Sequence, residues 1–425
     1  MEVASILKGR NLYIPRMTYG GAKAFAAAVR SVGINGQLSP ESSKRTLELA
    51  KHYTSGDECY PQQVTLGEFL QVMRSKEFVP KKTAFFMPTA GGPCRFGQYA
   101  TYMKRLLRDF GYQEAIVVSP ASDNSYDELG KEAGAELMRT GWRALVSADI
   151  LRKMLLKTRP YELNKGDTDR AYEESLDLIC QVLEKIGVRH KDRLAQLVDA
   201  LTKARHRFRS IPARYDKSRP LIGVVGEIFC RLNRFSNDEL IRIIEEQGGE
   251  VWLSDVSEWL WYTNWDQIKH IIRKGKKVSL EMLGAKLKNY IQKKDEHALL
   301  EPFKEDFQGY EEPEHVEEVL NYSKRYLPPR GCLGEMVLST GKAIYLYEKG
   351  ADGIVDISPF TCMNGITCEA VYPNLSRDHD GLPIRIFYFD GTQSNLDRDM
   401  GIFLELAKSY QRRKKKNRVY PFCFN

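Results

Sequence analysis

The sequence lacks any apolar run long enough to cross a membrane, which takes roughly 18 residues or more. Its first residues, Met-Glu-Val-Ala-Ser-Ile-Leu-Lys, show no basic segment followed by an apolar stretch, the pattern of a secretory signal. A phosphate-binding loop of the form G-x-x-x-x-G-K-[ST] is also missing, so we do not expect this chain to hydrolyse ATP. These absences predict a cytoplasmic protein without a membrane partner.

Cysteine pairs of the C-x2-C kind, which are typical of structural zinc sites, are missing although the chain has eight cysteines. In a cytosolic protein of this size, disulfides are not the default use of cysteine. A catalytic thiol would need a histidine partner, and none of the seven histidines lies in a loop comparable to those of the cysteines. Metal binding and simple burial remain the main alternatives.

Composition and charge are those of an ordinary globular protein of two to four domains, with 425 residues, 42% apolar and 28% charged. Much of the net charge of +8 falls in the run Arg412-Arg-Lys-Lys-Lys-Asn-Arg418. We expect this run to be the solvated end of the last helix, where cations are also favoured. A nucleic-acid surface would need further basic clusters and a recognisable module, so no nucleic-acid partner is expected.

Short apolar strand candidates alternate with helical segments over much of the chain, which predicts an α/β fold with largely parallel sheets. The strands are expected at 11–15, 83–87, 115–119, 221–225, 251–253, 353–357 and 384–389. Between about 131 and 208 only helical periodicity is present. Two helices can be given a starting residue. Ser236 with Glu239 predicts a capping box at the start of one, and a second helix is expected over Cys368–Leu375.

This pattern divides the chain into four parts. They are an α/β domain over 1–130 with the Cys59 and Cys94 loops, a helical insertion over 131–215, a second α/β unit with a helical extension over 216–330, and a C-terminal α/β part over 331–425 with Cys332, Cys362 and Cys368.

Several cysteines fall at the ends of predicted strands. Cys94 follows strand 83–87, Cys230 follows strand 221–225, and Cys362 follows strand 353–357. Open α/β sheets bind ligands outside the carboxyl ends of their strands. Helix N-termini at that edge favour negatively charged groups, and a metal–thiolate cluster is one such group.

Cys180 sits in an apolar helical segment and is interpreted as core packing, and Cys423 lies in the C-terminal tail. Six candidates remain, each in or near a loop: Cys59, Cys94, Cys230, Cys332, Cys362 and Cys368. Iron–sulfur clusters accept cysteines from distant loops, whereas zinc sites usually show close pairs. Their spacing is compatible with an iron–sulfur site but does not exclude zinc or buried structural thiols.

Five segments carry a family resemblance: 57–62, 86–99 with the specific string Gly92-Pro-Cys-Arg-Phe-Gly-Gln-Tyr99, 226–233, 334–341 and 359–363. Together they resemble the 2-hydroxyacyl-CoA dehydratase superfamily. Within it they are most similar to the branch of the CoA-dehydratase-activase-related and double-cubane-cluster proteins. The resemblance runs from about residue 13 to residue 406 and is thin across the helical insertions.

The resemblance implies Rossmann-like domains, oxygen-sensitive iron–sulfur chemistry, a homodimer, and a separate ATP-hydrolysing iron–sulfur activase that supplies electrons. It also implies a double-cubane [Fe8S9] cluster on six cysteines, with [4Fe-4S] as the fallback if Cys332 points away. The expected function is a low-potential reductase of small molecules. The alternatives are a 2-hydroxyacyl-CoA dehydratase-like subunit and a non-catalytic electron carrier.

Charged residues and glycines beside the ligand candidates have two possible roles each. Arg95 and Arg231 either offset the cluster's charge and bind substrate or form salt bridges elsewhere. Glu227 and Glu335 either donate protons to a reduced substrate or cap and orient a loop. Backbone amides at Gly92 and Gly334 are expected to donate hydrogen bonds to the cluster, which tunes its potential.

Overall fold

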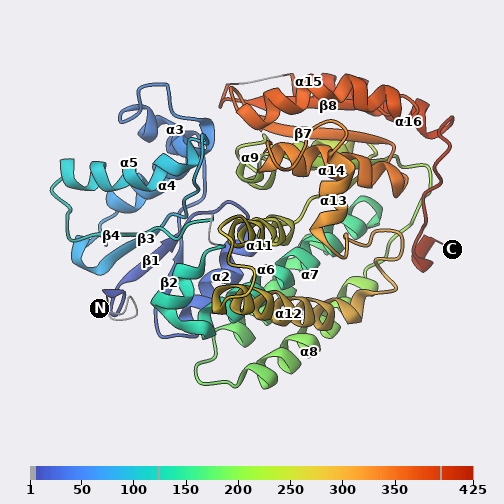
Figure 1. Ribbon diagram of the computed structural model, residues 1–425. Coiled ribbons are helices and arrows are strands. Elements are labelled where there is room, and N and C mark those ends of the chain that lie inside the picture. The colour runs from blue at the N-terminus through green and yellow to red at the C-terminus, as the bar shows by residue number, and fades with distance from the viewer. Residues whose placement is uncertain (1–5, 123–124, 333, 393–394, 425) are drawn as a thin grey trace. The chain divides into compact units, whose positions relative to one another are not determined.

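The computed structural model of the chain describes residues 6–122, 125–332, 334–392 and 395–424. These residues form an α/β structure, 56% helical, with two four-stranded sheets in which all strands are parallel (Figure 1). The predicted α/β class with parallel sheets is therefore confirmed. Within the described residues, none of the helices has the length and apolar character needed to cross a bilayer.

The chain forms two compact units, each assembled from three separate segments. Unit 1 comprises 1–150, 174–203 and 259–301, and unit 2 comprises 151–173, 204–258 and 302–425. Four helices contribute residues to both units: α6 (Asp127–Thr158), α7 (Asp167–Leu183), α8 (His190–Arg209) and α11 (Val256–Arg273).

Unit 1 contains the sheet with strand order β2-β1-β3-β4. Its strands are β1 (Asn11–Ile14), β2 (Asn35–Leu38), β3 (Thr83–Phe86) and β4 (Ile116–Val118). Its complete helices are α2 (Tyr19–Arg30), α3 (Lys44–Lys51), α4 (Tyr60–Met73), α5 (Phe96–Asp109) and α12 (Leu280–Leu300). Strand β2, Asn-Gly-Gln-Leu, was not predicted from the sequence, because Asn-Gly is a typical turn pair.

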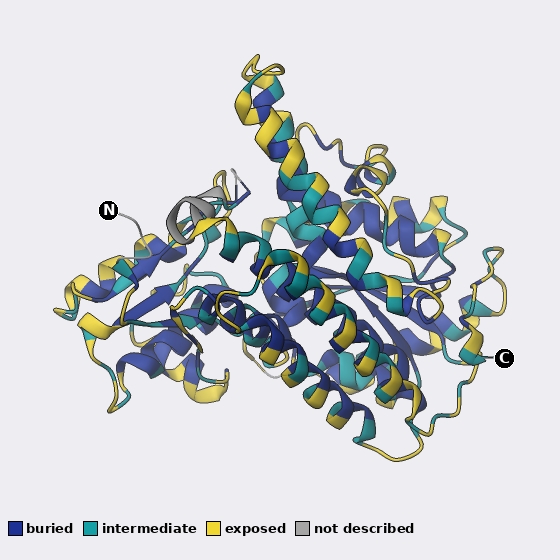
Figure 2. Cartoon of the chain, turned by 90° about the horizontal axis from the view of Figure 1, so that it is seen from below, coloured by how far each residue is buried: buried dark blue, intermediate teal, exposed yellow. Residues whose placement is uncertain are grey.

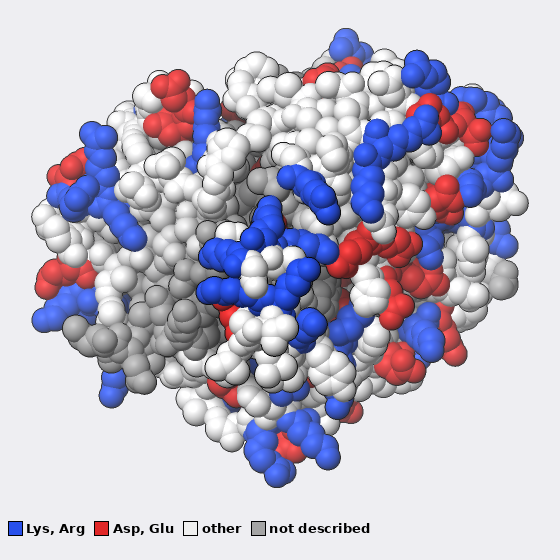
Figure 3. Space-filling model, viewed as in Figure 1, with Lys and Arg blue, Asp and Glu red and all other residues white. Residues whose placement is uncertain are grey.

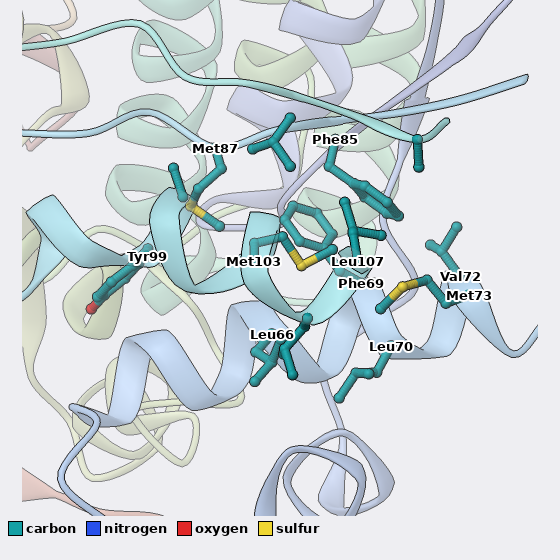
Figure 4. Packing of buried hydrophobic residues seen from close by; sticks show 14 of the residues in the cluster. Leu66, Phe69, Leu70, Val72, Met73, Phe85, Met87, Tyr99, Met103 and Leu107 are labelled. Atoms are coloured by element: carbon teal, nitrogen blue, oxygen red, sulfur yellow. The ribbon is translucent and has the colours of Figure 1, made fainter. Parts of the chain in front are cut away.

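The core of unit 1 lies between this sheet and helices α4 and α5. Phe69 of α4 and Met103 and Leu107 of α5 lie around Phe85 of β3 (Figure 4). The rings of Phe69 and Phe85 have centroids 4.7 Å apart, and both side chains are fully buried. Burying each such side chain contributes roughly 1.5–3 kcal/mol. This packing fixes α4 and α5, whose N-terminal ends carry Cys59 and Cys94.

Unit 2 contains the sheet with strand order β6-β5-β7-β8. Its strands are β5 (Leu221–Gly226), β6 (Glu250–Leu253), β7 (Gly353–Pro359) and β8 (Ile384–Phe389). Its complete helices are α9 (Ile228–Leu232), α10 (Leu240–Glu246), α13 (Val316–Ser323), α14 (Glu335–Glu348), α15 (Met363–Asp378) and α16 (Leu396–Gln411). Every residue of β5, β6 and β7 is buried (Figure 2), as expected for parallel strands covered on both faces.

Two predicted helix starts are wrong. Ser236 does not cap a helix, because its backbone N–H and its hydroxyl both donate to Asn233 Oδ1, each at 2.8 Å. Helix α10 instead begins after Glu239, which adopts φ +58° and pairs with Arg234. The helix expected from Cys368 begins at Met363, so Cys368 lies inside α15.

The basic run at the C-terminus is only partly solvated. Lys414 pairs with buried Asp352 at 2.6 Å. Arg418 is buried and donates to Glu250 and to the Tyr310 hydroxyl. The prediction of a solvated helix end is therefore wrong for these two residues, which fasten the tail to unit 2.

Helix α4 is held tightly against its surroundings at two adjacent residues. A Cβ on Gly67 would lie 2.1 Å from the carbonyl oxygen of Thr46 in α3, so the two helices touch backbone to backbone. The next residue, Glu68, is fully buried and accepts hydrogen bonds from the Ser42 hydroxyl (2.6 Å) and the Arg16 backbone N–H (3.1 Å).

Gly67→Ala is expected to lower the free energy of unfolding by about 1–3 kcal/mol, because the added methyl forces α3 and α4 apart. The matched control is Gly284→Ala in α12, where nothing lies within 4 Å of the new Cβ. That change should stabilise the chain by up to about 1 kcal/mol through helix propensity. Urea denaturation followed by circular dichroism measures both, and equal effects of the two substitutions would contradict the tight contact.

Glu68 should make stability depend on pH. Burial, which outweighs its hydrogen bonds, raises the pKa of Glu68 from 4.5 to about 7. The folded chain therefore binds a proton more readily than the unfolded chain, so the unfolding free energy falls as pH rises from about 5 to about 7. In Glu68→Gln this fall should shrink by up to about 3 kcal/mol. Urea denaturation at pH 5 and pH 7.5 tests this prediction. An equal change in unfolding free energy between the two pH values in both proteins would contradict it.

Candidate functional site

The candidate site of unit 2 begins where β5 and β7 end side by side. The two strands pair in parallel, with Gly226 opposite Ile357. Gly226 has φ +116°, and a Cβ there would lie 2.2 Å from the Ile357 carbonyl oxygen, so only glycine fits. The backbone N–H of Glu227 donates to that same oxygen at 2.9 Å. The chain therefore turns from β5 into α9 directly against β7.

Cys230 and Cys362 come together at this edge. Cys230 is fully buried in α9, and Cys362 is the N-cap residue of α15. Burial raises the pKa of the Cys230 thiol, and the charges of Glu227 and Cys362 raise it further. Burial likewise raises the pKa of Cys362. The backbone N–H groups of Gly365 and Asn364 donate to its sulfur and lower that pKa, but burial outweighs them. Two thiols thus lie within each other's electrostatic range beside a helix N-terminus.

Glu227 serves as the cap of α9. Its carboxylate oxygens accept hydrogen bonds from the backbone N–H groups of Phe229 (3.1 Å) and Cys230 (2.7 Å). Burial nevertheless raises the pKa of Glu227. The capping role considered for this residue from the sequence is therefore present in the structure, and it fixes the backbone that carries Cys230.

Glu335, the first residue of α14, reaches the same loops. Its Oε1 accepts from the backbone N–H of Ile228 (2.6 Å), and its Oε2 accepts from the side-chain amide of Asn364 (3.1 Å). Burial first, and then the charge of Glu227, raise the pKa of Glu335 to about 8. A carboxyl with this pKa is largely protonated at neutral pH. It provides a proton-carrying group that links α9, α14 and α15.

Arg231 is a buried cation of this site. Its side chain is buried, and one guanidinium nitrogen, Nη1, donates to the carbonyl oxygen of Gly226. Arg231 counteracts the effect of burial by lowering the pKa values of Glu227, Glu335 and Asp356. Among the described residues its Nε has no hydrogen-bond partner. A buried N–H without an acceptor is costly, so this group suits an acceptor supplied by a ligand.

Cys368 is placed differently from the other candidates. It lies inside α15 and is fully buried. Its sulfur contacts the carbonyl oxygen of Met336 at 3.5 Å and the hydroxyl of Thr340 at 3.8 Å, both in α14. Burial raises the pKa of the Cys368 thiol, and Asp356 and, to a smaller extent, Cys362 raise it further. Cys368 is therefore near the pocket but packs between two helices.

Cys332 and the two candidate glycines lie at turns. Cys332 is half-buried and donates its backbone N–H to Pro328 O at 3.0 Å, three residues before Glu335. Gly334 is the N-cap residue of α14 with φ +68°. Gly92 of unit 1 has φ +81°, and a Cβ there would meet open space. The short link to Glu335 places Cys332 at the N-terminal end of α14.

Unit 1 carries the remaining two candidates. Cys59 is the N-cap residue of α4, and its sulfur lies 2.6 Å from the Tyr99 hydroxyl. Cys94 is exposed and is separated from the first residue of α5 by one residue. That intervening residue is Arg95, whose guanidinium donates to the carbonyl oxygen of Asp57. Arg95 therefore fastens the Cys94 loop to the Cys59 loop through a backbone carbonyl and not through the salt bridge considered from the sequence.

Asp356 is a buried carboxylate near Arg231 that was not predicted as a site residue from the sequence. It lies in the middle of β7, and its carboxylate accepts from the hydroxyls of Tyr372 (2.6 Å) and Ser358 (2.9 Å). Burial raises the pKa of Asp356 despite these bonds. The available signal was an acidic residue inside the apolar strand Gly353-Ile-Val-Asp-Ile357, because buried carboxylates are rare without a partner.

No three His, Cys, Asp or Glu side chains in the described part of the chain are arranged as the ligands of a single metal ion. Neither a scan against protein-family models nor a search among curated proteins found a match to this sequence. Within unit 2 the structure brings together Cys230, Cys362, Glu227, Glu335 and Arg231, with Cys332 close along the chain.

Thiol reactivity should follow this placement. In folded, metal-free protein, iodoacetamide is expected to modify exposed Cys94 first and the buried Cys230 and Cys368 last, by at least about tenfold in rate. Burial both blocks the reagent and raises the pKa, which reduces the thiolate that reacts. Peptide mass spectrometry over time measures each rate. Protein unfolded in guanidinium is the control, in which the rates should converge; folded-state reaction of Cys230 as fast as Cys94 would contradict the buried pocket.

Proposed function

We propose that this chain is an iron–sulfur protein that acts as a low-potential reductase of small molecules and receives electrons from a separate ATP-hydrolysing iron–sulfur partner. The observation that carries the proposal is the placement of Cys230 and Cys362 just after the carboxyl ends of the adjacent parallel strands β5 and β7. This is the edge at which open α/β sheets bind ligands.

Cys230, Cys332 and Cys362 are the residues that would hold the cluster. In the dehydratases that the sequence resembles, one subunit holds a cubane on three cysteines, and these three lie at the starts of α9, α14 and α15. The absence of a single-ion site among the described residues is compatible with this assignment. A cubane carries its irons at separate corners, so its thiolates stand farther apart than the ligands of one ion.

The surrounding residues suit a negatively charged metal–thiolate group. Backbone N–H groups of Asn364 and Gly365 donate toward the sulfur of Cys362, and such bonds stabilise the negative charge of a metal-bound thiolate. Arg231 places an unpartnered Nε–H in the same buried pocket. When bound, the cluster supplies electrons one at a time at low potential.

Glu335 would hold the proton that a reduction consumes. Its Oε1 and Oε2 are oriented by Ile228 and Asn364, and burial keeps the carboxyl largely protonated at neutral pH. Glu227 raises the pKa of Glu335 and at the same time caps α9. In this proposal Glu227 positions Cys230, and Glu335 carries the proton.

A second candidate is favoured by the position of Cys368. The double-cubane [Fe8S9] form requires six cysteines, including Cys368, Cys59 and Cys94. Because Cys368 contacts Met336 and Thr340 between two helices, the three other candidate thiols of unit 2, Cys230, Cys332 and Cys362, match a single [4Fe-4S] cluster. A cluster of that size is what a 2-hydroxyacyl-CoA dehydratase-like subunit would hold.

Iron and sulfide counting on protein purified without oxygen tests the proposal. About eight irons per chain would support the reductase with a double cubane, and about four would support the dehydratase-like subunit with one cubane on Cys230, Cys332 and Cys362. The double substitution Cys230→Ala, Cys362→Ala should remove the iron bound in unit 2 and its visible absorbance. Cys423→Ala, in the C-terminal tail, is the matched control and should keep both.

Wild-type protein that is colourless and free of iron would contradict the proposal. So would full iron content in the double variant, provided that circular dichroism shows both proteins to be folded. The reductase activity is tested separately by adding a dehydratase-type activase and ATP. If the iron-loaded chain then reduces no acceptor, it is an electron carrier and not a reductase.

A further inference from the structure

Helices α11 and α12 form a hairpin with its own small core. The core consists of Ile271, Met282 and Ala285, and Ile268 and Ile272 pack against it. These side chains hold the two helices together near the turn that joins them. The hairpin tip is therefore a formed structure and not a loose loop.

The base of the hairpin is fixed to α6 within unit 1. The carboxylate of Asp295 accepts from the guanidinium groups of Arg139 (2.9 Å) and Arg143 (2.7 Å), and it is fully buried. Trp261 packs edge-on against Trp142, with ring centroids 5.1 Å apart. A buried carboxylate bound by two arginines resists displacement. The hairpin thus presents its tip from a rigid attachment.

One face of α12 is apolar and exposed. Leu280 is 88% exposed and Leu283 is 63% exposed, and Leu287 and Tyr290 are exposed as well. Their spacing of three, four and three residues puts them on one side of the helix, over roughly 15 Å. Met282 and Ala285 point to the opposite side, into the hairpin core. We call the four residues Leu280, Leu283, Leu287 and Tyr290 the α12 stripe.

Gly284 borders the α12 stripe in the second turn of the helix. A Cβ at this position would have no neighbour within 4 Å. Glycine in a helix costs about 1 kcal/mol relative to alanine, and here no contact in unit 1 accounts for it. The backbone at the edge of the stripe is therefore open to solvent at this position.

The hairpin tip is strongly basic. Residues 269–288 contain seven Lys or Arg and one Glu, so their net charge is 7 − 1 = +6, against +8 for the whole chain. Lys and Arg gather over α11 and α12 in Figure 3. Lys274, Lys277 and Lys286 are exposed, and none of them forms an ion pair within the described residues. The charge is therefore available to an external partner.

We propose that the α12 stripe and the lysines around it form the docking surface for a protein partner that presents carboxylates around an apolar helix or groove. Apolar burial would supply affinity, and the +6 charge would steer the encounter and select an acidic partner. The surface is small, which suits a transient complex. The proposal stands independently of the thiol pocket.

Other occupants fit less well. A second copy would bring two surfaces of charge +6 together, which like-charge repulsion disfavours. Nucleic acid would pair with the lysines but would leave the α12 stripe without an apolar partner. An anionic membrane would match both charge and apolarity. The vesicle experiment below separates this occupant from a protein partner.

Site-specific photo-crosslinking in the cells that produce the full-length protein tests the proposal. The photoreactive residue p-benzoyl-phenylalanine replaces Leu283, and in the control it replaces Ile186, which is 73% exposed elsewhere in unit 1. We expect the first variant alone to give an adduct with a different protein, whose crosslinked peptide is rich in Asp and Glu by mass spectrometry. The triple change Lys274→Glu, Lys277→Glu, Lys286→Glu should lower its yield at least tenfold.

The other outcomes overturn the proposal. One is an adduct between two copies of this chain, and another is an adduct whose yield is unchanged by the charge reversal. The same adduct formed from position 186, or the absence of any protein adduct, would also overturn it. Binding of the purified chain to phosphatidylglycerol vesicles that Leu283→Ser with Leu287→Ser abolishes would assign the surface to a membrane. The substituted side chains are exposed, and unchanged thermal melting confirms that the variants fold.

Discussion

The close parallel pairing of β5 with β7 is the constraint on which the candidate site depends. Gly226 allows the two backbones to approach so closely that any side chain there would strike the carbonyl oxygen of Ile357. Because the two strands run parallel, α9 and α15 both begin beyond the same edge of the sheet. Cys230 and Cys362, separated by more than a hundred residues in sequence, become neighbours for this reason.

Two buried carboxylates of unit 2, Glu250 and Glu335, have opposite pKa shifts because only one of them is paired with cations. Burial favours the neutral form of Glu250, but Arg418 and Lys157 outweigh it and lower its pKa to about 2. Glu335 has no ion-pair partner of comparable strength, so burial dominates and raises its pKa to about 8. Glu250 remains a fixed charge that fastens the C-terminal tail, whereas Glu335 can exchange a proton near neutral pH.

Much of the architecture follows from local patterns. Apolar strand candidates at 83–87, 221–225 and 353–357 correspond to β3, β5 and β7, and their alternation with helices gave the parallel topology. Strand β2 could not be found in this way, because Asn35-Gly36 is a turn pair that becomes a strand only through pairing with β1. The packing of α2 against β2 requires Gly36, since a Cβ there would lie 2.6 Å from Ala26 O.

The sequence by itself determined which cysteines lie at strand and helix ends, because a strand and the loop after it are adjacent in the chain. Only the packing of the whole chain puts Cys230 and Cys362 at one edge of the sheet, places Cys368 between α14 and α15, and buries Arg418. Proximity of thiols, burial of charge and shifts of pKa depend on distances between segments far apart in sequence. Local propensities contain no information on such distances, and only the packing of the sheet and its helices sets them.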